Sequence, residues 1–150
     1  MKESFLEAIA FTFQEEGFLS SDKWGGATVF GVARDYWPKD YDAIMTLIRK
    51  GDKAGAVAYA TEFYRRNMWN RIHADDLPHP LDVVAFDSSV NPGPGWCVEA
   101  LKQTQDWRKL LDERESYYEE RARHNPEKKK DLKGWGNRCD ALRAKYKELP

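Results

Sequence analysis

The stretch FQEEGFLSSDKWGGATVFG, residues 13–31, starts as the end of an amphipathic helix and finishes as a glycine-rich, β-forming segment. Two acids, Glu15 and Glu16, close the helix, and Gly17 stops it because glycine readily takes the left-handed conformation of a helix C-terminus. After this turn, the remaining glycines and the β-forming residues predict a loop or small hairpin over residues 18–31. The stretch therefore joins a pair of carboxylates to a short β element.

The position of Glu15 favours a carboxyl group that keeps its proton. The negative end of the helix dipole and the neighbouring charge of Glu16 both disfavour the ionised form, and we expect partial burial among nearby phenylalanines to add to this. A protonated carboxyl group is what general acid catalysis requires. The alternative is that both glutamates are simply solvated, and the residues alone leave the two interpretations open.

Three further residues of the stretch have chemistry that suits a sugar cleft. Asp22 or Thr28 could hold a water molecule on the opposite sugar face or stabilise an oxocarbenium ion. Trp24 could stack on a sugar ring, although packing explains a tryptophan nearly as well. For Asp22 the competing explanation is ordinary turn chemistry, because Ser-Ser-Asp is a common turn sequence.

The rest of the chain predicts a mainly α fold. Helical spacing is seen over residues 32–37, 41–52, 53–72, 81–91, 96–124 and 135–149, with a proline-containing break at 73–80 and a polar connection at 125–134. The segment 81–91 is apolar enough to be a buried central helix. We therefore expect a single helical domain with a small β or loop element near the N-terminus.

Asp87 and Asn91 lie one helical turn apart in that central segment, so they share a face. In the functional interpretation they bind a sugar or position Glu15. In the structural interpretation they fix the helix through buried hydrogen bonds. The spacing does not decide between these two roles.

Composition limits the possible partners. The 24 basic and 25 acidic residues nearly balance, so no overall field favours nucleic acid. The excess of basic residues after position 100 could help the protein meet an anionic polymer such as a bacterial wall, or it could simply be a solvated helix surface. The cysteines, Cys97 and Cys139, are read as free buried thiols, and the three histidines have no spacing that indicates a metal site. No cofactor is expected.

Four segments, in order, resemble a known family. EEGFLSSDKWGGATVFGV resembles the EGGY…DPGGATNYGI signature of the glycoside hydrolase family 108 muramidases, which occur as phage endolysins and related bacterial lysis proteins. FYRRNMW at 63–69, DDLPHPLDVVAFDSSVNPG at 75–93 and GWGNR at 134–138 are similar to later elements of that family. The matches extend from residue 15 to residue 138.

The resemblance implies a lysozyme-like fold and cleavage of the β-1,4 bond between N-acetylmuramic acid and N-acetylglucosamine, as a phage endolysin acting in host lysis. It places the catalytic acid at Glu15, while Glu16 stands where the family has a glycine. A register shift of one residue would make Glu16 the acid. The alternative function is a non-catalytic lysozyme-fold protein that binds peptidoglycan or belongs to the virion.

The length of 150 residues predicts a single domain, and the resemblance implies a catalytic part over about 1–95. A C-terminal helical part over about 96–150 is shortened relative to the family's wall-binding region. No signal peptide or membrane-spanning segment is recognised in the sequence. We therefore expect a monomer without stable membrane insertion, held in the host cytoplasm until a holin-type lesion releases it to the periplasm and its glycan strands.

Overall fold

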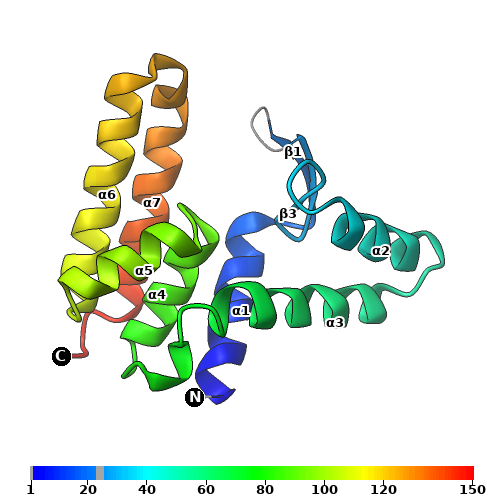
Figure 1. Cartoon of the computed structure of the whole chain (residues 1–150), viewed down its shortest axis with the longest axis horizontal. Helices are drawn as coiled ribbons and strands as arrows, with labels where there is room; N and C mark the ends of the chain where they lie inside the picture. The colour runs from blue at the N-terminus through cyan, green and yellow to red at the C-terminus, as the bar shows by residue number, and fades with distance from the viewer. Residues whose placement is uncertain (1, 23–25) are drawn as a thin grey trace. The chain divides into compact units, whose positions relative to one another are not determined.

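The computed structural model describes residues 2–22 and 26–150 and shows a mainly α protein with one three-stranded sheet (Figure 1). The longer elements are α1 (Lys2–Glu16), β1 (Leu19–Asp22), β2 (Gly26–Val29), β3 (Val32–Ala33), α2 (Pro38–Arg49), α3 (Lys53–Tyr64), α4 (Leu81–Val90), α5 (Pro94–Gln103), α6 (Trp107–His124) and α7 (Lys129–Lys145). The chain forms two compact units, Lys2–Arg71 and Ile72–Pro150. The mainly α prediction with a β element near the N-terminus is confirmed.

The first unit contains the predicted helix and hairpin. Strands β1 and β2 are antiparallel, with Leu19 opposite Val29 and Asp22 opposite Gly26. Strand β3 continues the sheet antiparallel to β2, in the order β1-β2-β3. Because Gly17 lies between α1 and β1, the sheet follows directly on the acidic end of the helix.

Helices α2 and α3 complete this unit. Pro38 begins α2, where a missing N–H costs nothing, and the side chain of Asp52 caps α3 by accepting from the backbone N–H of Gly55 at 2.8 Å. After α3 the chain continues as a π-helix over Arg65–Trp69. Trp69 is fully buried and its ring meets that of Phe5 edge to face, which ties this segment to α1 within the unit.

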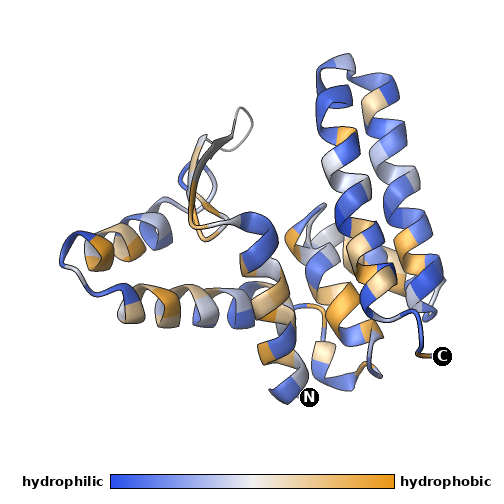
Figure 2. Ribbon diagram, turned by 180° about the vertical axis from the view of Figure 1, so that it is seen from behind, coloured by the Kyte–Doolittle hydropathy of each residue, from blue (hydrophilic) through white to orange (hydrophobic). Residues whose placement is uncertain are grey.

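The second unit is built around α4, whose residues from Leu81 to Ser89 are all buried. A helix that is buried on every side is mostly apolar all round, and the polar residues that α4 buries, such as Asp87 and Ser88, need hydrogen-bond partners. Helices α6 and α7 lie side by side as an antiparallel pair (Figure 1). The end of this pair where α6 ends and α7 begins is strongly hydrophilic (Figures 1 and 2). The predicted buried central helix is therefore observed.

Three local predictions were wrong. Residues 32–37 form β3 and a turn instead of a helix, because Val32 pairs with Val29 across a two-residue turn. The segment 96–124 is not one helix, since Asp106 caps α6 by accepting from the N–H groups of Arg108 and Lys109. The connection at 125–134 is mostly helical, because a short 3-10 turn over Pro126–Lys128 leads straight into α7.

The chain divides into its two compact units between residues 71 and 72, and not near residue 95, where the division into catalytic and C-terminal parts is expected. That expectation concerned the roles of the segments, and it stays a prediction. Helix α4 belongs to the same compact unit as α5, α6 and α7.

Candidate active site

The two carboxylates at the end of α1 differ in their exposure to solvent. Glu15 is exposed, while Glu16 is half-buried and its side-chain carbons lie close to the backbone of Gly31. Gly17 has φ +75° and its N–H donates to the carbonyl of Phe13 at 2.9 Å, so the helix ends in the left-handed glycine that the sequence predicts. The partial burial expected for Glu15 is not found, and Glu16 is the more enclosed of the two.

Thr28 belongs to the sheet that follows this helix end in the chain. Thr28 lies in β2, where it pairs with Ser20 on one side and Ala33 on the other, and it is half-buried. The backbone of Asp22 ends β1 opposite Gly26, two residue pairs further along the hairpin, and its side chain lies outside what the structure describes. Trp24, the candidate stacking residue, also lies outside the described residues.

Asp87 is held in a buried cluster with two arginines in the second unit. Arg138 donates to its carboxylate from Nε at 2.8 Å and from Nη2 at 2.7 Å, and Arg114 donates from Nη1 at 2.9 Å. Burial alone raises the pKa of Asp87, but the charges and hydrogen bonds of Arg138 and Arg114 outweigh it and lower this pKa to about 2. These contacts support the structural role considered for Asp87, and sugar binding by this residue stays an untested prediction.

Asn91 ends α4 and joins the same cluster. The hydroxyl of Tyr118 lies 2.9 Å from the main-chain oxygen of Asn91 and 3.1 Å from its Oδ1, and it accepts from Nε of Arg114 at 2.9 Å. Trp135 stacks on the Tyr118 ring with centroids 4.6 Å apart. Asn91 therefore helps to join α4 to α6, while its predicted sugar contact has no test here.

Arg114 and Tyr118 were not predicted from the sequence, although a signal for them was present. Both lie on the buried face of α6, four residues apart and in line with Leu110 and Ala122. An arginine on an otherwise apolar helical face has to meet a buried partner, because an unpaired charge in the interior is very costly. Among the described residues, Nη2 of Arg114 is a buried donor that has no hydrogen-bond partner.

Both cysteines are free and buried, as predicted. In the described parts of the chain, no group of three or more His, Cys, Asp or Glu side chains is arranged to hold a metal ion. None of the described helices combines the length and the apolar character that crossing a membrane requires.

Comparison with known proteins identifies the chemistry that this fold supports. The family model for Glycosyl hydrolase 108 matches residues 9–93, which is more than half of the chain and includes the acidic end of α1, the sheet and α4. The chain belongs to the glycosyl hydrolase 108 family. Membership makes it a glycoside hydrolase, a lysozyme-type enzyme whose substrate is peptidoglycan.

A solved structure with a similar fold extends the likeness beyond the matched residues. The structure of Brucella abortus SagA has a TM-score of 0.67 and 25% sequence identity, over 97% of this chain and 94% of that chain. No curated protein matches the sequence. The glycosyl hydrolase 108 chain thus shares its lysozyme-like fold with a structure of nearly the same extent, including α5, α6 and α7.

Proposed function

We propose that this enzyme is an N-acetylmuramidase that cleaves the β-1,4 bond between N-acetylmuramic acid and N-acetylglucosamine, with Glu15 as its general acid. The observation that carries the proposal is the acidic end of α1, where the exposed Glu15 is followed at once by a glycine turn and the Thr28-bearing sheet. A general acid has to reach the glycosidic oxygen, and an exposed carboxyl group at a fixed helix end can do so. The resemblance of this stretch to the family signature supports the same choice of residue.

The second group in this mechanism is Thr28, with Asp22 as the alternative. Strand residues advance by about 3.3 Å each, so the Asp22–Gly26 pair lies roughly 7 Å further along the hairpin than the Ser20–Thr28 pair. Thr28 is therefore the nearer of the two to the end of α1 along the strands. Its hydroxyl would orient the attacking water while Glu15 protonates the leaving oxygen.

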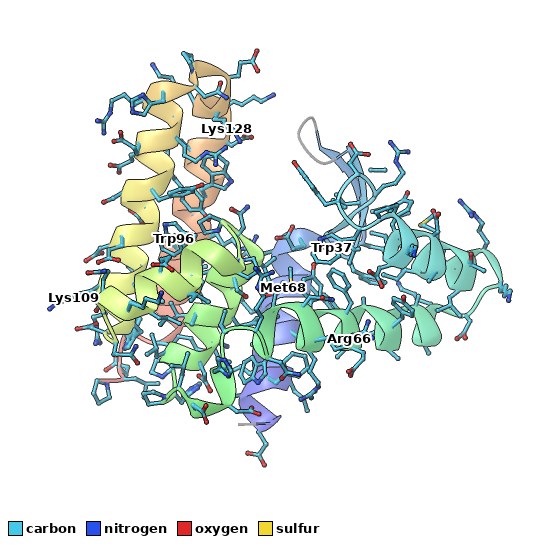
Figure 3. All side chains as sticks on the ribbon, viewed as in Figure 1. Trp37, Arg66, Met68, Trp96, Lys109 and Lys128 are labelled. Atoms are coloured by element: carbon cyan, nitrogen blue, oxygen red, sulfur yellow. The ribbon has the colours of Figure 1, made fainter. Side chains whose placement is uncertain are left out.

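The end of the α6–α7 hairpin where α6 ends and α7 begins carries charges that complement an anionic wall. Six basic side chains gather there, and we call them the basic end: Arg121, Arg123, Lys128, Lys129, Lys130 and Lys133. Lys128 is seen at this end of the hairpin (Figure 3). Peptidoglycan carries free carboxylates on its peptides, so these cations favour contact with the wall through long-range attraction.

The biological setting that we propose is phage lysis. Phage endolysins occur in the family, and such an enzyme is kept in the host cytoplasm until a holin-type lesion lets it reach the periplasm and wall. The chain would then act as a monomer on the glycan strands. Expression in a host with and without a holin gene tests this setting, since lysis should require both.

The chemical part is tested by the ends of the fragments released from purified sacculi. A muramidase leaves N-acetylmuramic acid at the reducing end, which mass spectrometry after borohydride reduction identifies. Reducing N-acetylglucosamine ends, or anhydro-muramic ends, would show a different bond or a different reaction. Thr28→Ala and Asp22→Asn, assayed in parallel, test the second group, and the larger fall in kcat is expected for Thr28→Ala.

A further inference from the structure

The turn between β2 and β3 has a strained backbone. Val29 pairs with Val32, so Phe30 and Gly31 alone make the turn, with φ values of 49° and 80°. Two-residue hairpin turns of this kind need positive φ at both positions. Glycine accepts that conformation freely, but a phenylalanine rarely does, so contacts from outside the turn must hold Phe30 there.

Tyr64, at the end of α3, supplies one of those contacts. Its hydroxyl donates to the carbonyl of Phe30 at 2.7 Å, and the residue is only 1% exposed. The N–H of Phe30 donates to the carbonyl of Phe18 at 2.7 Å, and the Phe30 ring packs on those of Phe13 and Phe18. The turn is thus fixed by a buried hydroxyl on one side and by the end of α1 on the other.

The same hydroxyl lies next to the acidic helix end. A methyl group placed on Gly31 would come within 2.5 Å of Oη of Tyr64 and 2.9 Å of Cγ of Glu16. The hydroxyl and the carbon stem of Glu16 therefore crowd the same side of Gly31. The Tyr64 ring also meets the ring of Phe13, three residues before Glu16, at 5.9 Å between centroids. The last turn of α1 is held against α3 through Tyr64.

We propose that Tyr64 is a positioning residue of this enzyme. Its hydroxyl holds the Phe30–Gly31 turn against the side-chain carbons of Glu16, and this support fixes the direction in which the Glu15 side chain projects from the end of α1. The inference rests on the proposed role of Glu15 as general acid. A misplacement of about 1 Å at a catalytic group can cost roughly a hundredfold in rate. A hydroxyl that keeps the last helical turn in place therefore acts on kcat without touching the sugar.

The test compares two single-hydroxyl deletions on the same helix. Tyr64→Phe keeps the ring and removes the hydrogen bond to Phe30. Tyr59→Phe is the matched control, because the Tyr59 hydroxyl donates to Oδ1 of Asp40 at 2.7 Å and has no part in the turn. Both variants are assayed for kcat, KM and Tm with soluble glycan fragments of defined length. We expect Tyr64→Phe to lower kcat at least about tenfold with KM within about twofold, and Tyr59→Phe to leave both unchanged.

A second variant tests the route through Glu16. Glu16→Ala removes the stem that packs on Gly31, so it should reproduce the kcat loss of Tyr64→Phe. In the double variant the two losses should not multiply, because both remove the same support. Full multiplication would show that Tyr64 does not act through this contact and would overturn the inference.

The outcomes separate the inference from the proposed function. If wild type releases muramic acid ends and Tyr64→Phe has the kcat of the control, the inference is wrong and the muramidase proposal stands. A loss of Tm with unchanged kcat in Tyr64→Phe would give Tyr64 a structural role alone. If wild type releases no fragments, the proposed function fails and the inference fails with it.

Discussion

Arg138 and Asp87 lie 51 residues apart in the chain and form two charge-assisted hydrogen bonds, of 2.8 and 2.7 Å, inside the second unit. Asp87 belongs to the FDSSVN part of one family-like segment, and Arg138 ends the GWGNR segment. The Asp87–Arg138 ion pair therefore gives a structural reason for two of the four segments that resemble the family. Their pairing fastens α7 to the buried α4.

This pair predicts a loss of stability in acid. The pKa of Asp87 is lowered in the folded protein to about 2, so its contribution is complete above the ordinary carboxyl range near pH 4 and disappears as the pH falls through about 2. The contribution is on the order of 2 kcal/mol. Urea unfolding should show the stability gap between wild type and Asp87→Asn narrowing over this interval.

The control for that experiment is Asp112→Asn, because Asp112 bonds Arg143 at the surface with 70% of its side chain exposed. Exposed ion pairs contribute roughly 0–1 kcal/mol. The difference in free energy of unfolding between wild type and Asp112→Asn should therefore be small at every pH. A gap for Asp87→Asn that stays constant from pH 5 to pH 2 would contradict the assigned charge state of Asp87.

The two thiols should be inert in the native protein. Burial raises the pKa of Cys97 to about 12 and that of Cys139 to about 11, and thiol reactions need the thiolate. At pH 8 a disulfide reagent such as Ellman's should modify neither until denaturant is added, when both should react. Rapid modification of one thiol in the folded protein would show that its surroundings open in solution.

Two glycine substitutions should act in opposite directions. Gly31→Ala adds a methyl group at φ +80° against Tyr64 and Glu16, so it should destabilise the fold by at least about 1–2 kcal/mol. Gly134 lies in the interior of α7, and apart from its chain neighbours and the backbone of its own helix no heavy atom lies within 4 Å of the new carbon, so Gly134→Ala should stabilise the fold by about 0.5–1 kcal/mol. Thermal or urea unfolding checks both, and a tolerated Gly31→Ala would contradict the crowding at the turn.

The basic end should govern attachment to the wall at low salt. In a Glu15→Gln background, replacing Lys129, Lys130 and Lys133 by Glu should weaken co-sedimentation with sacculi at least about threefold, since each exposed charge contributes roughly 0.2–1 kcal/mol. The effect should shrink in high salt, where such charges are screened. The control makes the same charge change at three exposed basic residues of the first unit, Lys39, Arg49 and Lys50. Equal losses in both variants would rule out a local role for the basic end.

The sequence predicted the parts of the fold that depend on local pattern. The apolar run 81–91 became the buried helix α4, and the glycine after Glu16 ended α1 as expected. Boundaries that depend on side-chain caps were missed, because Asp106 and Asn125 act only through hydrogen bonds to nearby N–H groups. Residues 32–37 were misassigned because strand pairing with β2 decided their conformation.

The candidate site residues that the sequence offers lie mostly on one continuous stretch. Glu15 and Thr28 come from the opening stretch, whose turn and strands fix where they lie, and their catalytic roles stay predictions. The partners of Asp87 come from helices 27 and 51 residues further on, which helical spacing alone does not bring together. Tyr64 was missed for the same reason, since its bond to Phe30 joins residues 34 apart.

The most direct test of the central claim compares wild type with Glu15→Gln and Glu16→Gln on purified sacculi, following the release of muramic acid ends and checking each fold by circular dichroism. Gln keeps the size of the side chain and removes the acid. We expect Glu15→Gln to lower the rate by about 10²–10⁴, as expected for loss of a general acid, while Glu16→Gln still releases fragments. A folded Glu16→Gln that is inactive beside an active Glu15→Gln would contradict the assignment of Glu15 and move the acid to Glu16.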